Sequence, residues 1–87
     1  MKLNADFLLT PIGEEFMLIP TGSAALRFHG VVKLNDSAAF IIRRLQSETD
    51  ADAIVEAMAA KYEGTREQFE RALDNTLTQL RSIGAIE

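Results

Sequence analysis

The stretch that decides the fold is RFHGVVKLNDSAAFIIRRLQ, which runs from Arg27 to Gln46. Its first half has the alternation typical of a short strand, which we place at about Gly30–Leu34. Asn35 then has the side chain of a good helix N-cap. Apolar residues recur after it at helical spacing, at Ala38, Ile41, Ile42 and Leu45. The stretch predicts a strand leading directly into an amphipathic helix, and it contains no nucleophile–base pair, metal cluster or phosphate loop.

Two apolar runs precede this stretch and predict a hairpin. Phe7–Ile12 and Phe16–Ile19 are separated by Gly13-Glu14-Glu15, a short connection that favours a turn. Pro11 lies inside the first run, so that strand is expected at the edge of a sheet or to end early. Residues 20–23, Pro-Thr-Gly-Ser, end the second run as a loop. With the strand near Gly30–Leu34, the chain predicts a small three-stranded antiparallel sheet.

Two further helices are predicted after the first. Thr49 is the expected N-cap of the second helix, whose apolar stripe ends at Tyr62 before Gly64. Thr65 and Gln68 have the spacing of a capping box and open the third helix, which Gly84 ends. Three strands followed by three helices predict an α+β fold with the helices on one face of the sheet. This order resembles a winged-helix layout with the sheet moved to the front.

Length, charge and cysteine content bound the function. The 87 residues suffice for one domain, residues 1–87. There are no cysteines, which excludes disulfides, thiolate catalysis and zinc–sulfur sites. The N-terminus lacks the pattern of a signal peptide, and no apolar run approaches the roughly 20 residues that span a bilayer, so we expect a cytoplasmic protein. The net charge of −4 argues against nucleic acid and anionic membranes as partners.

The candidate chemical groups all have a simpler interpretation. His29 is the only histidine and has no nucleophile or metal-ligand neighbour in the sequence, so a surface position is expected. Glu67, Glu70 and Asp74 share one face of the third helix, as a solvated surface does. Arg43-Arg44 is too small a basic patch to indicate a ligand. We therefore assign no catalytic residue, metal ligand or cofactor.

The third strand is the remaining candidate site. A short strand at a sheet edge presents unpaired N–H and C=O groups, which a protein either protects or uses. Between Val31 and Leu34 the only charge is Lys33, and there is no proline. Such an edge can accept an extended peptide as an additional strand. The alternative, which the pattern alone favours, is a strand that merely completes the fold.

Three segments carry a resemblance to a known family. They are VVKLNDSAAFIIRRL, TDADAIVEAMAAKYEG and the ending LRSIGAIE, together with the early Phe-Leu-Leu and Glu-Phe-Met-Leu-Ile strands. In this combination the chain resembles, over nearly all of its length, the PqqD family, named for pyrroloquinoline quinone (PQQ) biosynthesis protein D. The resemblance implies a non-enzymatic domain without a cofactor. It would bind the leader of a ribosomally made precursor peptide and present it to a modifying enzyme, often a radical S-adenosylmethionine protein.

The resemblance also implies where the leader binds. It would add as a strand beside the third strand and lie against the third helix. The strand positions would be Val31, Val32, Lys33 and Leu34. The helix positions would be Phe69, Leu73, Thr76 and Leu77, with Arg66 and Glu70 at the rim.

Several alternatives stay open at this point. A winged-helix-like DNA-binding regulator is the second interpretation, although residues 69–83 carry only Arg71 and Arg81 as basic residues. A small enzyme is disfavoured because no nucleophile, metal cluster or cofactor motif is present. The PQQ pathway, another modified-peptide pathway, a monomer and a homodimer all fit the sequence.

Overall fold

The hairpin at the start of the chain forms as the sequence predicts. In the computed structural model, which describes residues 1–28 and 30–86, β1 (Phe7–Ile12) pairs antiparallel with β2 (Glu15–Pro20). Gly13 has a φ of 64° at the first position of the two-residue turn, a conformation that glycine adopts without steric cost. β1 is an edge strand, as its Pro11 indicates, and it continues through that proline.

A short helix that the sequence analysis missed follows the hairpin. α1 (Ala24–Arg27) follows the expected loop at residues 20–23, in a segment for which no element was predicted, so a helix precedes the third strand. Asp6 holds the turn before α1, because its carbonyl oxygen accepts from the Thr21 N–H at 2.7 Å and its carboxylate accepts from the Ser23 hydroxyl. Four residues are too few for helical periodicity to appear in a sequence.

The third strand is shorter than predicted. β3 (Val32–Leu34) has three residues instead of the expected five from Gly30. Gly30 has a φ of 119°, which is unfavourable for other residues, and the strand begins after it. Val31 lies immediately before the strand, and His29 lies outside the described residues. β3 pairs antiparallel with β2, so the sheet order is β1-β2-β3 and β3 forms the second edge.

The first and last of the three long helices begin where the sequence predicts. α2 (Asp36–Arg44) follows Asn35, whose side-chain oxygen accepts from the Ala38 N–H at 2.8 Å. α4 (Arg66–Ser82) begins with the predicted reciprocal capping box between Thr65 and Gln68. In both cases the cap satisfies N–H groups that have no partner inside the helix.

The N-cap of the middle helix is one residue later than predicted. α3 (Ala51–Lys61) is capped by Asp50, whose carboxylate accepts from the Ala53 N–H at 2.9 Å. Thr49 instead donates its backbone N–H to the carbonyl oxygen of Met1 at 3.0 Å. The contact between Thr49 and the start of the chain joins residues far apart in sequence, and local propensity does not contain that information.

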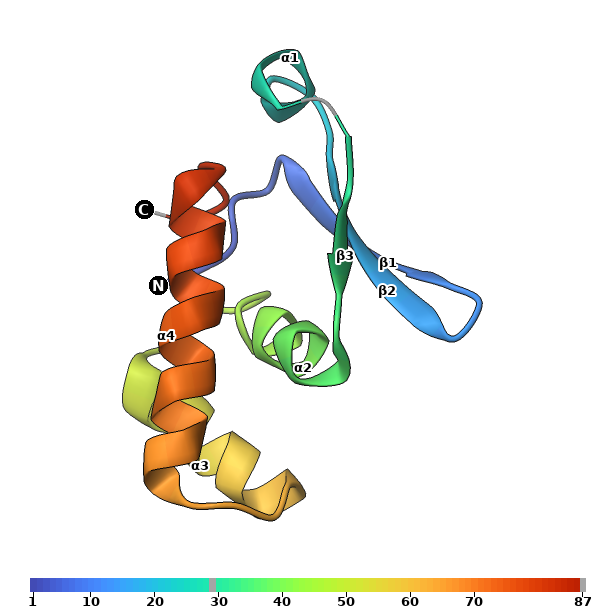
Figure 1. Cartoon of the computed structure of the whole chain (residues 1–87). Helices are drawn as coiled ribbons and strands as arrows, with labels where there is room; N and C mark the ends of the chain where they lie inside the picture. Colours follow the sequence, from blue (N-terminus) through green and yellow to red (C-terminus); the bar gives the residue numbers. More distant parts are fainter. Residues whose placement is uncertain (29, 87) are drawn as a thin grey trace.

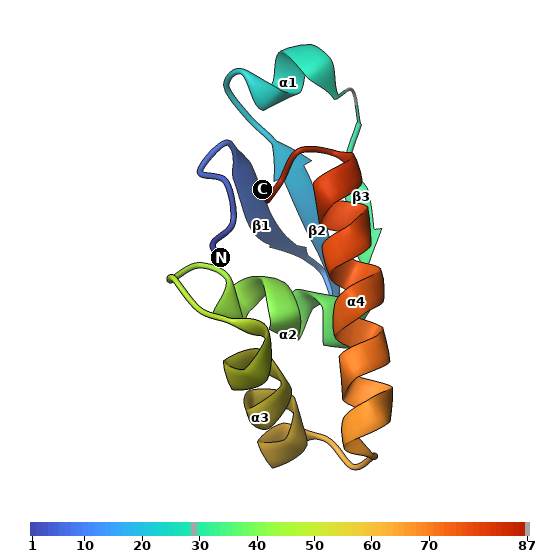
Figure 2. The same cartoon turned by 90° about the vertical axis from the view of Figure 1, so that its left-hand side faces the viewer.

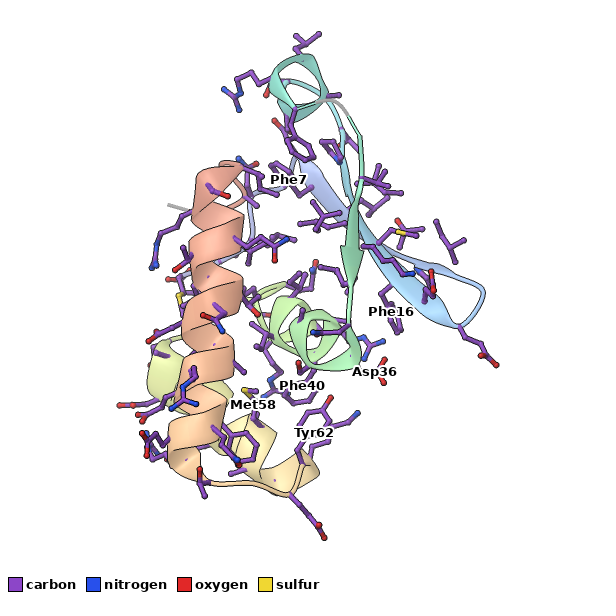
Figure 3. The ribbon with its side chains drawn as sticks, viewed as in Figure 1. Phe7, Phe16, Asp36, Phe40, Met58 and Tyr62 are labelled. Atoms are coloured by element: carbon purple, nitrogen blue, oxygen red, sulfur yellow. The ribbon has the colours of Figure 1, made fainter. Side chains whose placement is uncertain are left out.

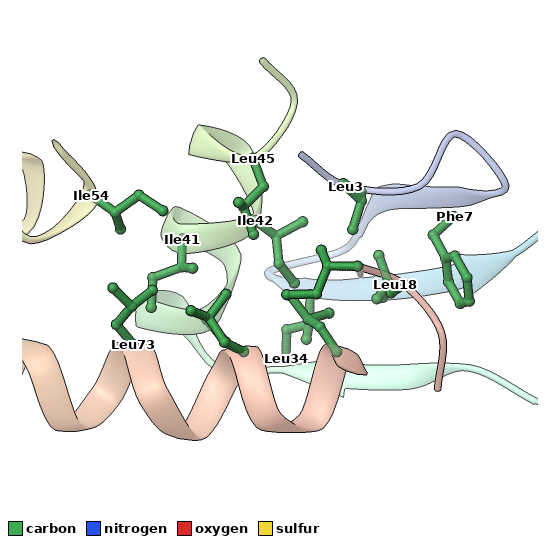
Figure 4. Packing of buried hydrophobic residues seen from close by; sticks show 14 of the residues in the cluster. Leu3, Phe7, Leu18, Leu34, Ile41, Ile42, Leu45, Ile54 and Leu73 are labelled. Atoms are coloured by element: carbon green, nitrogen blue, oxygen red, sulfur yellow. The ribbon is translucent and has the colours of Figure 1, made fainter. Parts of the chain in front are cut away.

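All three long helices lie on the same side of the sheet: α2 packs against the strands, and α3 and α4 pack against α2 and against each other (Figures 1 and 2). The inward side chains of the strands, among them Leu18 and Leu34, pack against Ile41 and Ile42 of α2 (Figure 4). The N-terminal segment is tied into this core, since the Leu3 N–H donates to the carbonyl of Leu45 at 2.8 Å. The α+β class, the antiparallel sheet and the winged-helix-like layout are thus confirmed, with α1 as an addition. The other face of the sheet carries no helix in the described part of the chain.

The Asn35 cap is expected to stabilise the junction between β3 and α2. Replacing it in Asn35→Ala removes the acceptor of the Ala38 N–H and should lower the free energy of unfolding by about 1 kcal/mol. Urea unfolding followed by circular dichroism measures this change. Asn75→Ala, at an exposed position inside α4, is the matched control and should change stability by less than about 0.5 kcal/mol. Equal losses in both variants would show that the cap contributes nothing.

Candidate functional site

The two edges of the sheet differ in the backbone groups that they offer. On the β1 edge, Pro11 has no N–H, and the Phe7 N–H already donates to the carbonyl of Asn4 at 3.0 Å. On the β3 edge, Val31 and Lys33 take part in none of the backbone hydrogen bonds described outside the helices and strands. Pro11 and Phe7 thus leave fewer free N–H groups on the β1 edge, and the β3 edge can form hydrogen bonds with another extended chain.

The hairpin turn determines which groups of β3 point outward. Gly13 is the first residue of a two-residue turn of type II′, which closes with a hydrogen-bonded pair between Ile12 and Glu15. Pairs alternate along an antiparallel ladder, so Pro11 and Phe16 form a non-hydrogen-bonded pair. Phe16 therefore directs its backbone groups toward β3. This orientation fits Pro11, because the N–H that it lacks would have pointed into solvent.

The same alternation continues across β2 into β3. Phe16 pairs with Leu34 and Leu18 pairs with Val32, so Val32 and Leu34 direct their N–H and C=O groups to β2. Lys33 lies between them, and both of its backbone groups point to the open edge. Of the four predicted strand positions, three lie in β3: Val32 and Leu34 hold it in the sheet, and Lys33 presents the open edge. Val31 precedes the strand.

Little protects this edge. The Lys33 ammonium lies 2.9 Å from the Glu15 carboxylate, and both side chains are about half exposed or more. An exposed ion pair of this kind contributes on the order of 0–1 kcal/mol and leaves the backbone accessible. A single neutralised lysine is a weak barrier to strand addition compared with a proline or a bulge.

The predicted α4 positions lie in the core. Phe69, Leu73, Thr76 and Leu77 are all buried, with exposed fractions of 2–9%. They form one stripe that packs against α2 and α3. A domain of this size needs such a stripe for its core, and little of these side chains remains for contact with a ligand.

The two predicted rim residues point toward α3. Arg66 forms an ion pair with Asp52 in the first turn of α3 at 3.1 Å and with Glu70 at 3.4 Å. Both residues of α4 are exposed, and they lie on the flank of the helix that faces α3. The structure brings Arg66 and Glu70 together with each other but not with β3.

The opposite flank of α4 is on the side of β3. In Figure 2, α3 lies to the left of α4, whereas β3 lies behind its right-hand edge. At 100° per residue, Ala72, Gln79 and Ile83 occupy the flank opposite that of Arg66. Ala72 and Ile83 are half-buried against the core, and Gln79 is exposed. None of these three residues was among the helix positions predicted to contact the leader. Their spacing of 7 and 4 residues, which places them along one line beside the buried stripe of α4, is the sequence signal that could have indicated this flank.

The remaining candidates are surface features. Glu67 and Arg71 form the expected i,i+4 pair at 3.6 Å, and Asp74 is exposed. Arg43 lies over the ring of Phe16, 4.4 Å from its centroid, in a cation–π contact. No group of three or more potential metal ligands occurs among the described residues, and none of the described helices has the length and hydropathy to cross a bilayer.

The fold and the open edge define a small winged-helix-like domain with a strand available for pairing. The family model of coenzyme PQQ synthesis protein D (PqqD) matches residues 13–86. The chain belongs to the PqqD family. This confirms the resemblance inferred from the sequence.

Two solved structures share the fold. One is described as TbiB1 in complex with the TbiA(beta) leader peptide; it is 24% identical, with a TM-score of 0.81 over 100% of this chain and 95% of that one. The other is lasso peptide synthetase B1 complexed with the leader peptide, 22% identical, with a TM-score of 0.74 over 93% of this chain and 89% of that one. A search of curated protein sequences gave no match.

The hydrogen-bond alternation in β3 can be tested without a ligand. The Lys33 amide, which points outward, should exchange with solvent close to its intrinsic rate. The Val32 and Leu34 amides bond to β2 and should be protected at least tenfold. Amide hydrogen exchange followed by NMR measures all three. Protection of Lys33 with fast exchange of Leu34 would mean that β3 has the other register.

Proposed function

We propose that this chain binds the leader segment of a ribosomally synthesised precursor peptide as a fourth strand on β3. The bound leader is then presented to a modifying enzyme, for which a radical S-adenosylmethionine protein is the first candidate. The chain acts as a peptide chaperone in the cytoplasm and carries out no chemistry itself. Two structures of the same fold are complexes with leader peptides, which supports this assignment.

The single observation that carries the proposal is the open edge of β3. The backbone groups of Lys33 point outward, and Val31 makes no described backbone hydrogen bond. In the part of the chain that the structure describes, the exposed ion pair of Lys33 with Glu15 is the protection that this edge has. A strand added here forms main-chain hydrogen bonds, each contributing about 0.5–1.5 kcal/mol net. These bonds do not depend on the leader's side chains, so they give affinity without strict sequence requirements.

Selectivity then comes from the side chains beside the edge. Side chains of the leader that point inward lie next to Val32 and Leu34 and face the flank of α4 formed by Ala72, Gln79 and Ile83. This flank is uncharged and includes one small residue, Ala72. We therefore propose these three α4 residues, rather than the buried stripe, as those that contact the leader.

A proline at the outward position tests the main-chain contact. Lys33→Pro removes one N–H and leaves a carbonyl of the leader unpaired, so the leader should bind about tenfold or more weakly, a loss of about 1–3 kcal/mol. Lys33→Ala keeps the N–H and should bind within about threefold of the unmodified chain. Isothermal titration with the leader of the precursor encoded nearest the gene measures both, and circular dichroism verifies that the variants fold. Equal affinity for the proline variant would contradict the proposal.

A second variant tests which flank of α4 contacts the leader. Ala72→Gln adds bulk on the β3 side and should weaken leader binding at least tenfold, because the added side chain occupies the space of the peptide. Ala60→Gln makes the same change at an exposed position of α3 and is the matched control. If Arg66→Ala weakens binding and Ala72→Gln does not, the leader contacts the flank that faces α3 instead.

A further inference from the structure

The segment that carries the open edge is the basic part of an acidic chain. Residues 20–35, from the end of β2 to the N-cap of α2, contain Arg27 and Lys33 and no Asp or Glu, which gives them a formal charge of +2 with His29 neutral. The whole chain has a net charge of −4. Both basic side chains are exposed, and α1, which carries Arg27, lies at the end of the sheet where β3 begins (Figure 1). A peptide that lies along β3 therefore meets a positive local potential.

The wall of the site that α4 forms does not offset this charge. The flank on the side of β3, which consists of Ala72, Gln79 and Ile83, carries no charged group. Glu70 lies on the other flank, where it pairs with Arg66 at 3.4 Å. Among the described residues of this flank, a carboxylate on the bound leader thus meets no acidic group.

Lys33 is the β3 side chain that a bound strand meets on the side away from α4. Val32 and Leu34 pack against the core, so by alternation Lys33 belongs to the side chains that project away from the helices (Figure 3). Both of its backbone groups point to the open edge. A leader that continues the antiparallel sheet therefore places one residue directly opposite Lys33, joined to it by two hydrogen bonds and with the two Cα atoms about 5.5 Å apart. The side chains of such a pair contact each other.

The ion pair with Glu15 leaves Lys33 able to bind a second carboxylate. Lys33 pairs with Met17 across the ladder, so Glu15 is its diagonal neighbour on β2, on the side away from the open edge. The ammonium has three N–H donors, and 67% of the Lys33 side chain is exposed. Exposed pairs of this kind are weak, so the ammonium can turn to a carboxylate on the leader at little cost.

We propose that the leader carries an aspartate or a glutamate at the position opposite Lys33, and that this position distinguishes among peptides that can all form the strand. The inference rests on the proposed leader binding and adds the chemistry of one leader residue to it. Opposite charges on directly facing residues of neighbouring strands attract, and like charges there are destabilising. A neutral residue at this position loses the attraction, and a lysine or an arginine is repelled.

An exchange of the two charges tests the inference and keeps the sheet intact. The double variant Glu15→Lys/Lys33→Glu retains an ion pair between β2 and β3, the net charge and every backbone N–H, but it presents a carboxylate to the leader instead of an ammonium. Glu67→Arg/Arg71→Glu exchanges another exposed pair, on α4, and is the matched control.

The probes are synthetic peptides. They are the leader of the precursor encoded nearest the gene, a series in which each acidic residue in turn is replaced by its amide, and a series in which each residue in turn is replaced by Lys. Isothermal titration measures every peptide against the unmodified chain and both exchanged chains.

We expect one acidic position of the leader to stand out. With the unmodified chain, its amide should bind about two- to threefold more weakly and its Lys replacement about fivefold or more weakly. The Glu15→Lys/Lys33→Glu chain should reverse this order at the same position, so that the Lys-substituted peptide binds more tightly than the leader itself. The control chain should keep the original order, and salt at about 0.5 M should reduce these differences.

The outcomes separate this inference from the proposed function. If the leader loses affinity for Lys33→Pro but no position reverses its preference with the exchanged chain, the leader binds on β3 and the inference is wrong. Equal weakening of all peptides by the exchange would also overturn it, because the exchange would then act only on the sheet. A leader that fails to bind the unmodified chain would contradict the proposed function, and the inference with it.

Discussion

Three strands have two edges and two faces, and the packing of α2 on one of those faces, with α3 and α4 packed against α2, decides what the rest of this molecule can do. The helices bury the inner side chains around Leu18, and no helix of the described residues covers the other face of the sheet. Pro11 removes a donor from one edge, and the type II′ turn at Gly13 fixes the alternation that points Lys33 outward on the other. The β3 edge is the one that we propose for leader binding.

α4 shows how a small domain keeps its core and its recognition surface apart. The buried stripe from Phe69 to Leu80 holds α4 on α2 and α3, and a domain of 87 residues has few other side chains for that purpose. Contact with a ligand must then come from the flanks of the helix. Arg66 on one flank is engaged with Asp52 of α3. The flank that includes Ala72 faces β3, and its small residue allows an added strand to approach.

Most of the fold could be predicted because its signals are local. The capping box at Thr65, the N-cap at Asn35 and the apolar runs of the hairpin each depend on residues within one or two turns of the chain. The missed elements depend on distant contacts: Asp6 stabilises the turn that starts α1, and Thr49 bonds to Met1 instead of capping α3. The candidate site was predictable only in part, for the same reason. The edge strand follows from sequence, but the flank of α4 that faces it depends on where α3 packs.

The division between backbone and side-chain contacts also indicates how specificity can change within this fold. Main-chain bonds at Lys33 depend on the geometry of β3, so substitutions there that keep the N–H should preserve these bonds whatever the leader's sequence. Substitutions at Ala72 or Gln79 change the shape and polarity beside the inward side chains of the leader, and these should alter which leader binds. The other set of leader side chains would point away from α4. This chain would therefore select a leader mainly through every second residue of the bound strand.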